Sequence, residues 1–188
     1  MYEKEDFRGF LDRLRKEKEL TDIKQPVDIR HIATLVDQSE SALCFHDVIG
    51  YDMPVVSGII RSSRRAAISM GCSNFSEIEF RLQQGIEHPI APKYVKTAEC
   101  KEVIEAGEKV DLFRLPIPMS SIHDGGPMIT AGVVIARDPE HGLNSGMYRF
   151  MVKEKNLTGI DIVTPNNMRL FAQRAFEAGR PCPISISI

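Results

Sequence analysis

Residues 128–138 read MITAGVVIARD, and residues 145–155 read SGMYRFMVKEK. The first stretch is rich in β-branched residues and ends at an Asp-Pro pair, which is typical of a strand that runs into a turn. In the second stretch, Tyr148 and Arg149 fall on opposite sides, as alternating residues of a strand do. The two stretches therefore predict an antiparallel β-hairpin.

The residues after this hairpin predict a further strand and then a helix. Residues 157–163 (LTGIDIV) are a candidate partner strand. Asn166 or Asn167 can cap a helix that continues to Ala178, and Gly179 fits the position just after the helix end.

The chain ends in another strand pattern, PCPISISI at residues 181–188. No turn, charge or partner strand follows it, and an unpaired strand leaves backbone N–H and C=O groups unmet. We therefore expect the chain to be a piece of a longer protein. The alternative is that the protein naturally ends here and the strand pairs elsewhere.

The first hundred residues alternate helical and strand patterns. Residues 6–20 carry an amphipathic helical stripe with Asp6 as its N-cap, residues 20–23 and 42–48 read as short strands, and a helix is expected within residues 75–84. This alternation favours layers of helix against sheet.

Residues 85–127 differ from both flanks because they hold many prolines and glycines. Such a density of chain breakers indicates extended connecting segments. The sequence thus predicts a mixed α/β (α+β) fold, with an N-terminal α/β domain at residues 1–105 and a second domain at residues 106–188.

The composition is that of an ordinary globular protein, with 188 residues, 43% hydrophobic, 27% charged and a formal net charge of -2. No basic excess favours a nucleic-acid partner. No apolar run approaches the roughly 20 residues of a membrane-spanning helix. The charged N-terminus lacks the apolar segment of a secretion signal, so we expect a cytoplasmic protein.

The cysteines and histidines show no spacing typical of a metal site. The four cysteines lie far apart without a CxxC pair, so we expect reduced thiols rather than zinc ligands or disulfides. The histidines are expected to be ordinary polar residues. These residues are Cys44, Cys72, Cys100 and Cys182, with His31, His46, His88, His123 and His141.

One group of residues is a candidate site. Asn144 is expected in the hairpin turn or in a bulge, with its amide oxygen available to a hard cation. Arg149, on the strand, can bind phosphate or carboxylate through two parallel hydrogen bonds. Gly146 leaves room for a planar ligand near the backbone. The alternative is a plain hairpin in which Asn144 only makes the turn and Arg149 is solvated.

Several longer stretches resemble the UbiD family of prenylated-flavin-dependent decarboxylases. They are DLFRLPIPM (111–119), DGGPMITAGVVIARDPEHG (124–142), NSGMYRFMVKEK (144–155) and EAGRPCPISISI (177–188). The resemblance implies reversible decarboxylation of aromatic or α,β-unsaturated carboxylic acids. It implies prenylated FMN made by a separate flavin prenyltransferase, with Mn²⁺ and K⁺ at the phosphate. It also implies a split β-barrel that binds the flavin, and a homo-oligomer.

The resemblance also assigns roles to residues. Asn144 matches a metal-ligand Asn, Met147, Tyr148 and Arg149 match the cofactor-contacting segment, and Arg149 matches the Arg of a catalytic Glu-Arg-Glu network. Many members carry a metal-binding His where this chain has either Asn166 or Asn167. We assign both to the cofactor site, together with Gly146, and Asn166 to the metal.

The third metal-ligand Glu and both catalytic Glu residues of the family match no position before residue 188. We therefore expect this chain to be an N-terminal portion that is inactive alone. Two alternatives stay open: a non-catalytic subunit of a multi-subunit aromatic carboxylase, and a plain FMN-binding split-barrel protein.

Overall fold

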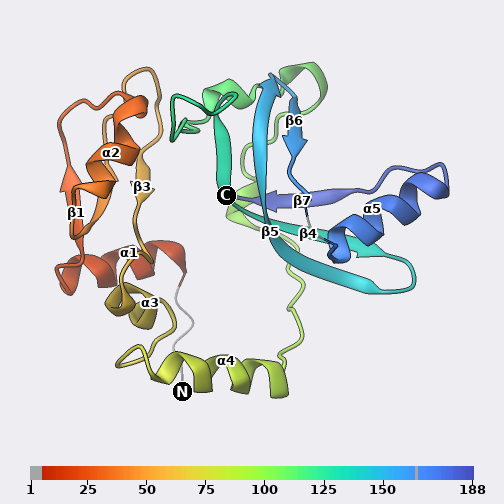
Figure 1. Ribbon diagram of the computed structural model, residues 1–188, viewed down its shortest axis with the longest axis horizontal. Coiled ribbons are helices and arrows are strands. Elements are labelled where there is room, and N and C mark those ends of the chain that lie inside the picture. The colour runs from red at the N-terminus through yellow and green to blue at the C-terminus, as the bar shows by residue number, and fades with distance from the viewer. Residues whose placement is uncertain (1–5, 164) are drawn as a thin grey trace. The chain divides into compact units, whose positions relative to one another are not determined.

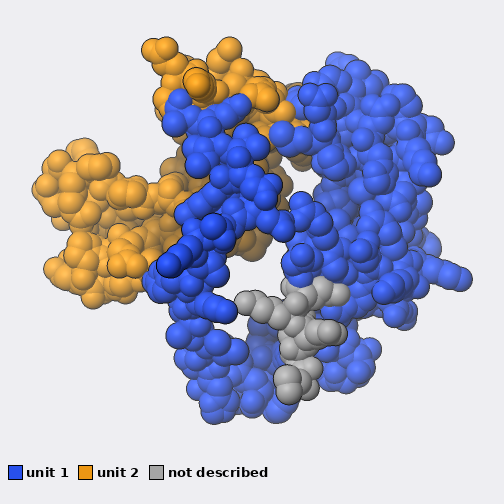
Figure 2. All heavy atoms as spheres, turned by 180° about the vertical axis from the view of Figure 1, so that it is seen from behind, with its two compact units in different colours: residues 1–106 blue, residues 107–188 orange. Residues whose placement is uncertain are grey.

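The computed structural model describes residues 6–163 and 165–188, and the chain divides into two compact units (Figures 1 and 2). Unit 1 is Met1–Ala106 and unit 2 is Gly107–Ile188. Each combines one β-sheet with helices, so the fold is α+β. Among the helices of the described residues, none has both the length and the apolar character needed to cross a bilayer.

Unit 1 contains a three-stranded sheet in the order β1-β2-β3. The central strand β2 pairs in parallel with β1 and antiparallel with β3. The strands are β1 (Leu20–Ile23), β2 (Ala42–Phe45) and β3 (Val55–Ser57), and the helices are α1 (Phe7–Lys16), α2 (Ile32–Asp37), α3 (Ser63–Ser69) and α4 (Glu77–Glu87).

Helix α1 confirms the predicted helical stripe but ends earlier than expected. The Asp6 side chain accepts a hydrogen bond from the Gly9 N–H at 2.7 Å, which caps the first turn. Lys18 has φ 59°, in the left-handed region, so the helix stops before the strand begins at Leu20. The buried Leu14 faces the sheet.

Both faces of β2 are buried. Ala42 and Cys44 pack with Leu14 of α1, whereas Leu43 and Phe45 pack with residues of α2. Burial raises the pKa of the Cys44 thiol, and the charge of Asp22 adds to this effect. A central strand covered on both sides gives unit 1 its core.

Two helices of unit 1 behave differently from their sequence patterns. The sequence does not predict helix α3, because its charged residues form no apolar stripe. Ser62 caps this helix. Its buried Arg65 donates to the Glu40 carbonyl at 2.7 Å and pairs with Glu19 at 3.1 Å. Helix α4 is the one predicted within residues 75–84, but none of its residues is buried.

Of residues 85–127, predicted to be connecting, Gly85–Glu87 belong to helix α4 instead. The rest of the segment, residues 88–127, has the connecting character that the sequence predicts. This segment holds only short 3₁₀ turns, at Glu99–Lys101, Gly107–Lys109 and Leu112–Arg114. Ile117 is its one buried residue, and it packs into the core of unit 2.

Unit 2 contains a four-stranded open sheet in the order β6-β5-β4-β7. The predicted hairpin of β4 and β5 is confirmed as antiparallel. The final strand also finds a partner, since β7 pairs antiparallel with β4, with Val133 opposite Ser187. The elements are β4 (Met128–Asp138), β5 (Gly142–Glu154), β6 (Leu157–Ile160), α5 (Asn167–Glu177) and β7 (Ile184–Ser187).

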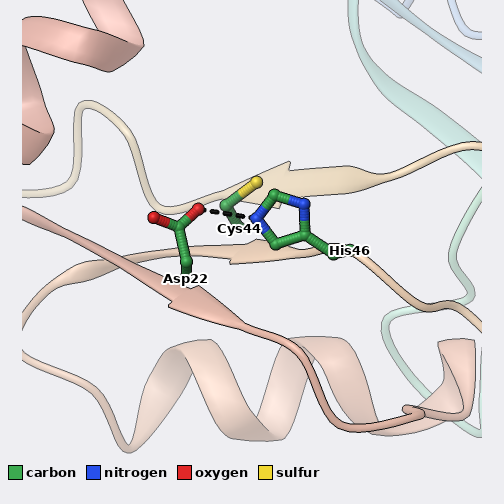
Figure 3. Close-up of side chains that lie close together, drawn as sticks. All are labelled: Asp22, Cys44 and His46. Carbon is green, nitrogen blue, oxygen red and sulfur yellow. Dashed lines mark hydrogen bonds and ion pairs between the residues drawn. The ribbon is translucent and has the colours of Figure 1, made fainter.

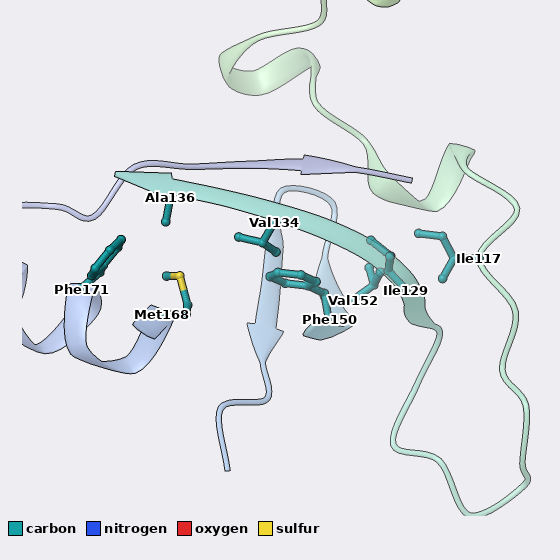
Figure 4. Packing of buried hydrophobic residues seen from close by; sticks show 8 residues of the cluster. All are labelled: Ile117, Ile129, Val134, Ala136, Phe150, Val152, Met168 and Phe171. Atoms are coloured by element: carbon teal, nitrogen blue, oxygen red, sulfur yellow. The ribbon is translucent and has the colours of Figure 1, made fainter. Parts of the chain in front are cut away.

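Helix α5 covers one face of this sheet (Figure 4). The inward residues alternate along β4 and β5 as a half-buried sheet requires, and Met168 and Phe171 of α5 close the core over them. The buried cluster consists of Ile117, Ile129, Val134, Ala136, Phe150, Val152, Met168 and Phe171. The other face of the sheet keeps apolar residues exposed, including Val133, Ile135 and Met147.

Candidate functional site

Asn144 lies inside strand β5, directly opposite Ala136 of β4. The prediction that it belongs to a turn or a bulge is therefore wrong. The turn closes earlier, where the buried Asp138 accepts hydrogen bonds from the backbone N–H groups of Glu140 (2.9 Å) and His141 (3.1 Å). These two hydrogen bonds stabilise a tight turn directly after β4. Strand β5 therefore already begins at Gly142 and includes Asn144.

The same carboxylate ties the turn to helix α5. Arg174 of α5 donates through Nε to Asp138 at 3.3 Å. Burial by itself would raise the pKa of Asp138, but the two backbone N–H donors and the Arg174 charge lower it below its usual value. The carboxylate therefore stays ionised and fixes the hairpin against the helix.

Asn144 and Arg149 lie on opposite faces of the sheet, as the alternation predicted. Asn144 and Tyr148 face helix α5, and each reaches an Asn at its start. Arg149 and Met147 lie on the other face, where Met147 is 68% exposed.

The structure distinguishes the two Asn residues at the start of α5. Asn167 donates through Nδ2 to Oδ1 of Asn144 at 2.9 Å. Asn166 is the N-cap, and its Oδ1 accepts from the Arg169 N–H at 3.0 Å and from the Tyr148 hydroxyl at 3.3 Å. Asn167 is thus the partner of Asn144, while Asn166 holds the helix start and Tyr148.

The space above Gly146 is filled by a side chain of the same strand. A Cβ added at Gly146 would lie 2.9 Å from Cε2 and 3.1 Å from the hydroxyl oxygen of Tyr148. The absent side chain therefore leaves room for the Tyr148 ring, which in turn reaches Asn166.

We predict that Gly146→Ala lowers the free energy of unfolding of the 188-residue chain by about 1–3 kcal/mol, because the new methyl group must displace the Tyr148 ring. Urea unfolding followed by circular dichroism measures the change. Gly159→Ala, in β6, is the matched control, since its added Cβ would meet only Cε of Lys153, at 3.5 Å. Equal effects of the two substitutions would contradict the predicted crowding.

Arg149 forms an ion pair with Asp161, the residue that follows β6. The Asp161 N–H also donates to the Arg149 carbonyl at 3.1 Å, so backbone and side chain are held together. Strand β6 ends opposite Phe150. Among the described residues no further strand pairs with β5 on this side, so its edge is open from Gly142 to Tyr148.

A cavity of about 250 Å³ lies at this open edge of β5. It combines a cation and a carboxylate with an amide, a phenol and apolar side chains. It is smaller than the roughly 300–1,000 Å³ of most ligand sites. Its walls are Thr130, Met147, Tyr148, Arg149, Asp161, Val163 and Asn166.

The cavity joins four of the residues singled out in the sequence: Met147, Tyr148, Arg149 and Asn166. Asn144, Gly146 and Asn167 do not line it, although Asn144 and Asn167 bond each other beside it. Sequence reasoning missed Asp161 and Thr130. A single acidic residue in the apolar stretch LTGIDIV was the only local signal for Asp161, and its pairing with Arg149 depends on the β5–β6 register.

Two family models match the chain. The UbiD model, described as the Rift-related domain of 3-octaprenyl-4-hydroxybenzoate carboxy-lyase, matches residues 93–188. The model of the N-terminal domain of the same carboxy-lyase matches residues 11–82.

Similar proteins include an anhydromevalonate phosphate decarboxylase of Methanothermobacter thermautotrophicus. It is 29% identical over 182 residues, which cover 96% of this chain and 42% of that protein. An uncharacterised protein of Rhodospirillum rubrum is 31% identical, with 97% of this chain and 41% of that protein covered. The chain thus spans about two-fifths of the length of the curated relatives it matches.

Solved structures with the same fold include an evolved dimeric form of the UbiD-class enzyme HmfF from Pelotomaculum thermopropionicum, in complex with prFMN. The TM-score is 0.89 at 33% identity, covering 96% of this chain and 43% of that one. Vanillic acid decarboxylase of Sedimentibacter hydroxybenzoicus, in its closed form, gives a TM-score of 0.87 at 27% identity, covering 100% and 43%. With a UbiD model matching more than half of its residues, this chain belongs to the UbiD family.

Proposed function

We propose that the whole protein is a non-oxidative, reversible decarboxylase of aromatic or α,β-unsaturated carboxylic acids that uses prenylated FMN. The cavity beside Arg149 carries the proposal, because it offers a guanidinium to a carboxylate or phosphate at the open edge of a sheet. The named activities of the decarboxylases similar to this chain, and the prFMN in the HmfF complex, support it.

In this proposal the cofactor and its ions bind against unit 2. Asn144 and Asn167 would supply amide oxygens to Mn²⁺, which prefers oxygen ligands, in place of the hydrogen bond between their side chains, with K⁺ nearby at the phosphate. Asn167 is preferred to Asn166 as the metal ligand, since the Asn166 Oδ1 already accepts two hydrogen bonds. When bound, the flavin would supply the electron-accepting centre for loss of CO₂.

The other residues of β5 would bind and orient. Arg149 would hold the substrate carboxylate in a fixed orientation through its two parallel N–H donors. Met147 would contact the cofactor from the exposed sheet face, and Tyr148 would do so from the side of Asn166. Gly146 would act indirectly, by leaving room for Tyr148.

The exposed face of the unit 2 sheet supports the view that this unit is the start of a split β-barrel. Val133 and Ile135 are 38% and 44% exposed on it, next to Met147. An apolar sheet face of this kind is normally covered by protein or ligand. We propose that the whole protein supplies this cover and is a homo-oligomer in the cytoplasm, with a flavin prenyltransferase as its cofactor source.

We propose that the 188-residue chain is inactive alone, because the Glu that would return a proton matches no position in it. The test compares this chain with the whole protein, each produced together with a flavin prenyltransferase. Release of CO₂ is measured over a panel of aromatic and α,β-unsaturated acids. We expect turnover by the whole protein only.

The same experiment, with flavin binding measured as well, distinguishes the two alternative functions. Turnover that requires a second, different subunit would favour a non-catalytic UbiD-like subunit. Tight binding of plain FMN without Mn²⁺, and no turnover of any acid, would favour a plain flavin-binding protein. Turnover by the 188-residue chain would overturn the assignment of the proton donor to a part outside it.

A further inference from the structure

We propose that Asp22, Cys44 and His46 form a three-ligand site for a divalent metal ion of borderline softness, with Zn²⁺ as its natural occupant (Figure 3). Their ligand atoms, a carboxylate oxygen, the Cys44 sulfur and an imidazole nitrogen, all lie within 4.8 Å of one another. The site is in unit 1 and shares no residue with the cavity of unit 2.

The sheet register brings the three residues together. Asp22 of β1 lies directly opposite Cys44 of β2 in the parallel pair. His46 follows Cys44 by two residues, so its side chain returns to the same side of the sheet. The backbone N–H of His46 donates to the Ile23 carbonyl at 3.0 Å. Three ligand types from separate positions thus converge through backbone pairing that the core already fixes.

The ligand set selects the metal. A thiolate, formed when Cys44 gives up its proton to solvent on metal binding, an imidazole and a carboxylate match the sulfur, nitrogen and oxygen donors of zinc sites, whereas Mg²⁺ and Ca²⁺ prefer oxygen ligands. Ligand atoms around tetrahedral zinc lie about 3.3–3.8 Å apart, as its bond lengths of about 2.0–2.3 Å require. A contraction of about 1 Å around Cys44 would suffice, together with replacement of the 2.7 Å contact between Asp22 Oδ1 and His46 Nε2 by two metal bonds.

Solvent reaches the site from one side. Cys44 is buried at the inner end of the site, whereas the side chains of Asp22 and His46 are 32% and 46% exposed. A metal ion can therefore enter past the two polar residues. Three protein ligands leave a fourth tetrahedral position for water, as in open zinc sites.

Arg15 of α1 supports the carboxylate from outside. Its Nε and Nη2 each donate to a different oxygen of Asp22, both at 3.0 Å, and its Nη1 pairs with Asp12 at 2.9 Å. The hydrogen bonds from Arg15 lower the pKa of Asp22 to about 2. Hydrogen bonds of this kind fix ligating carboxylates in known metal sites. A fully ionised carboxylate also retains lone pairs beyond those that Arg15 uses.

The test titrates Co²⁺, as a spectroscopic stand-in for zinc, into the chelator-treated 188-residue chain. We expect one equivalent to bind, with the visible bands of tetrahedral cobalt and a near-ultraviolet sulfur-to-cobalt band, and we expect Zn²⁺ to displace it. Cys44→Ser should remove the sulfur band, and His46→Gln should weaken binding by more than about tenfold. Cys72→Ser and His88→Gln are the matched controls and should bind like the parent.

Since Cys44 is buried, its variant is checked for folding by circular dichroism, and the exposed His46 gives a second, milder readout. Zinc should raise the Tm of the parent chain and raise that of His46→Gln by less at the same zinc concentration. Absence of a sulfur-to-cobalt band in the parent, or an undiminished band in Cys44→Ser, would overturn the proposal.

Discussion

Replacing Arg149 with alanine in the whole protein lowers kcat/KM for decarboxylation by about 10²–10³-fold or more. The proposed role of this guanidinium is to hold the substrate carboxylate through two parallel hydrogen bonds, and alanine offers neither the charge nor the donors. Asp161 pairs with Arg149 and bonds its carbonyl, so the side chain is positioned at the cavity before substrate arrives. The rate of CO₂ release at saturating and at low substrate gives the change in kcat and in KM.

Three companion variants of the whole protein make the Arg149 result specific. Arg137→Ala removes an exposed Arg from the neighbouring strand β4, outside the cavity, and should leave activity unchanged. Arg149→Lys keeps the charge without the planar fork and should recover only a small part of the rate. Asp161→Asn should lose less than Arg149→Ala, since it removes the support and keeps the guanidinium. Activity in Arg149→Ala equal to that of Arg137→Ala would refute the role.

Replacing Phe150 with alanine lowers the free energy of unfolding of unit 2 by about 3–5 kcal/mol. Phe150 is 2% exposed, sits on β5 opposite Ile129, and belongs to the buried cluster closed by Met168 and Phe171 of α5. Its removal leaves a cavity between the sheet and the helix that the surrounding residues can fill only in part. A loss of this size is a large share of the total free energy of unfolding of a domain.

Hydrogen exchange read by mass spectrometry measures this effect for each unit separately. We expect faster exchange in peptides of β4, β5 and α5, with the unit 1 strands unchanged. Phe176→Ala, on the same helix α5 but with a side chain that is 85% exposed, is the matched control and should cost less than about 0.5 kcal/mol. Equal losses for Phe150→Ala and Phe176→Ala would show that the cluster is not the core of unit 2.

Elements whose signals are local were predictable. The hairpin of β4 and β5 follows from alternation and a turn, and α5 follows from its Asn166 cap and from Gly179, which has φ 63°. The helix in residues 63–69 was missed, since its helical state rests on the Ser62 cap and on burial of Arg65 against Glu19 and Glu40 rather than on an apolar stripe.

The candidate site was likewise predictable only in part. The sequence pointed to Asn144, Tyr148 and Arg149, because their residue types and their resemblance to a family are visible without coordinates. It could not pair Arg149 with Asp161 or Asn144 with Asn167, because those contacts depend on the β5–β6 register and on where α5 begins.

The amino-acid pattern by itself determined the existence of the main strands and helices, the mixed α+β class and the family, since alternation, caps and long matching stretches are properties of the chain. Only the tertiary structure decided that β7 closes against β4, that Arg149 meets Asp161, and that Asp22, Cys44 and His46 converge. These contacts join residues far apart in sequence. Their geometry is set by strand register and core packing, which no local pattern encodes.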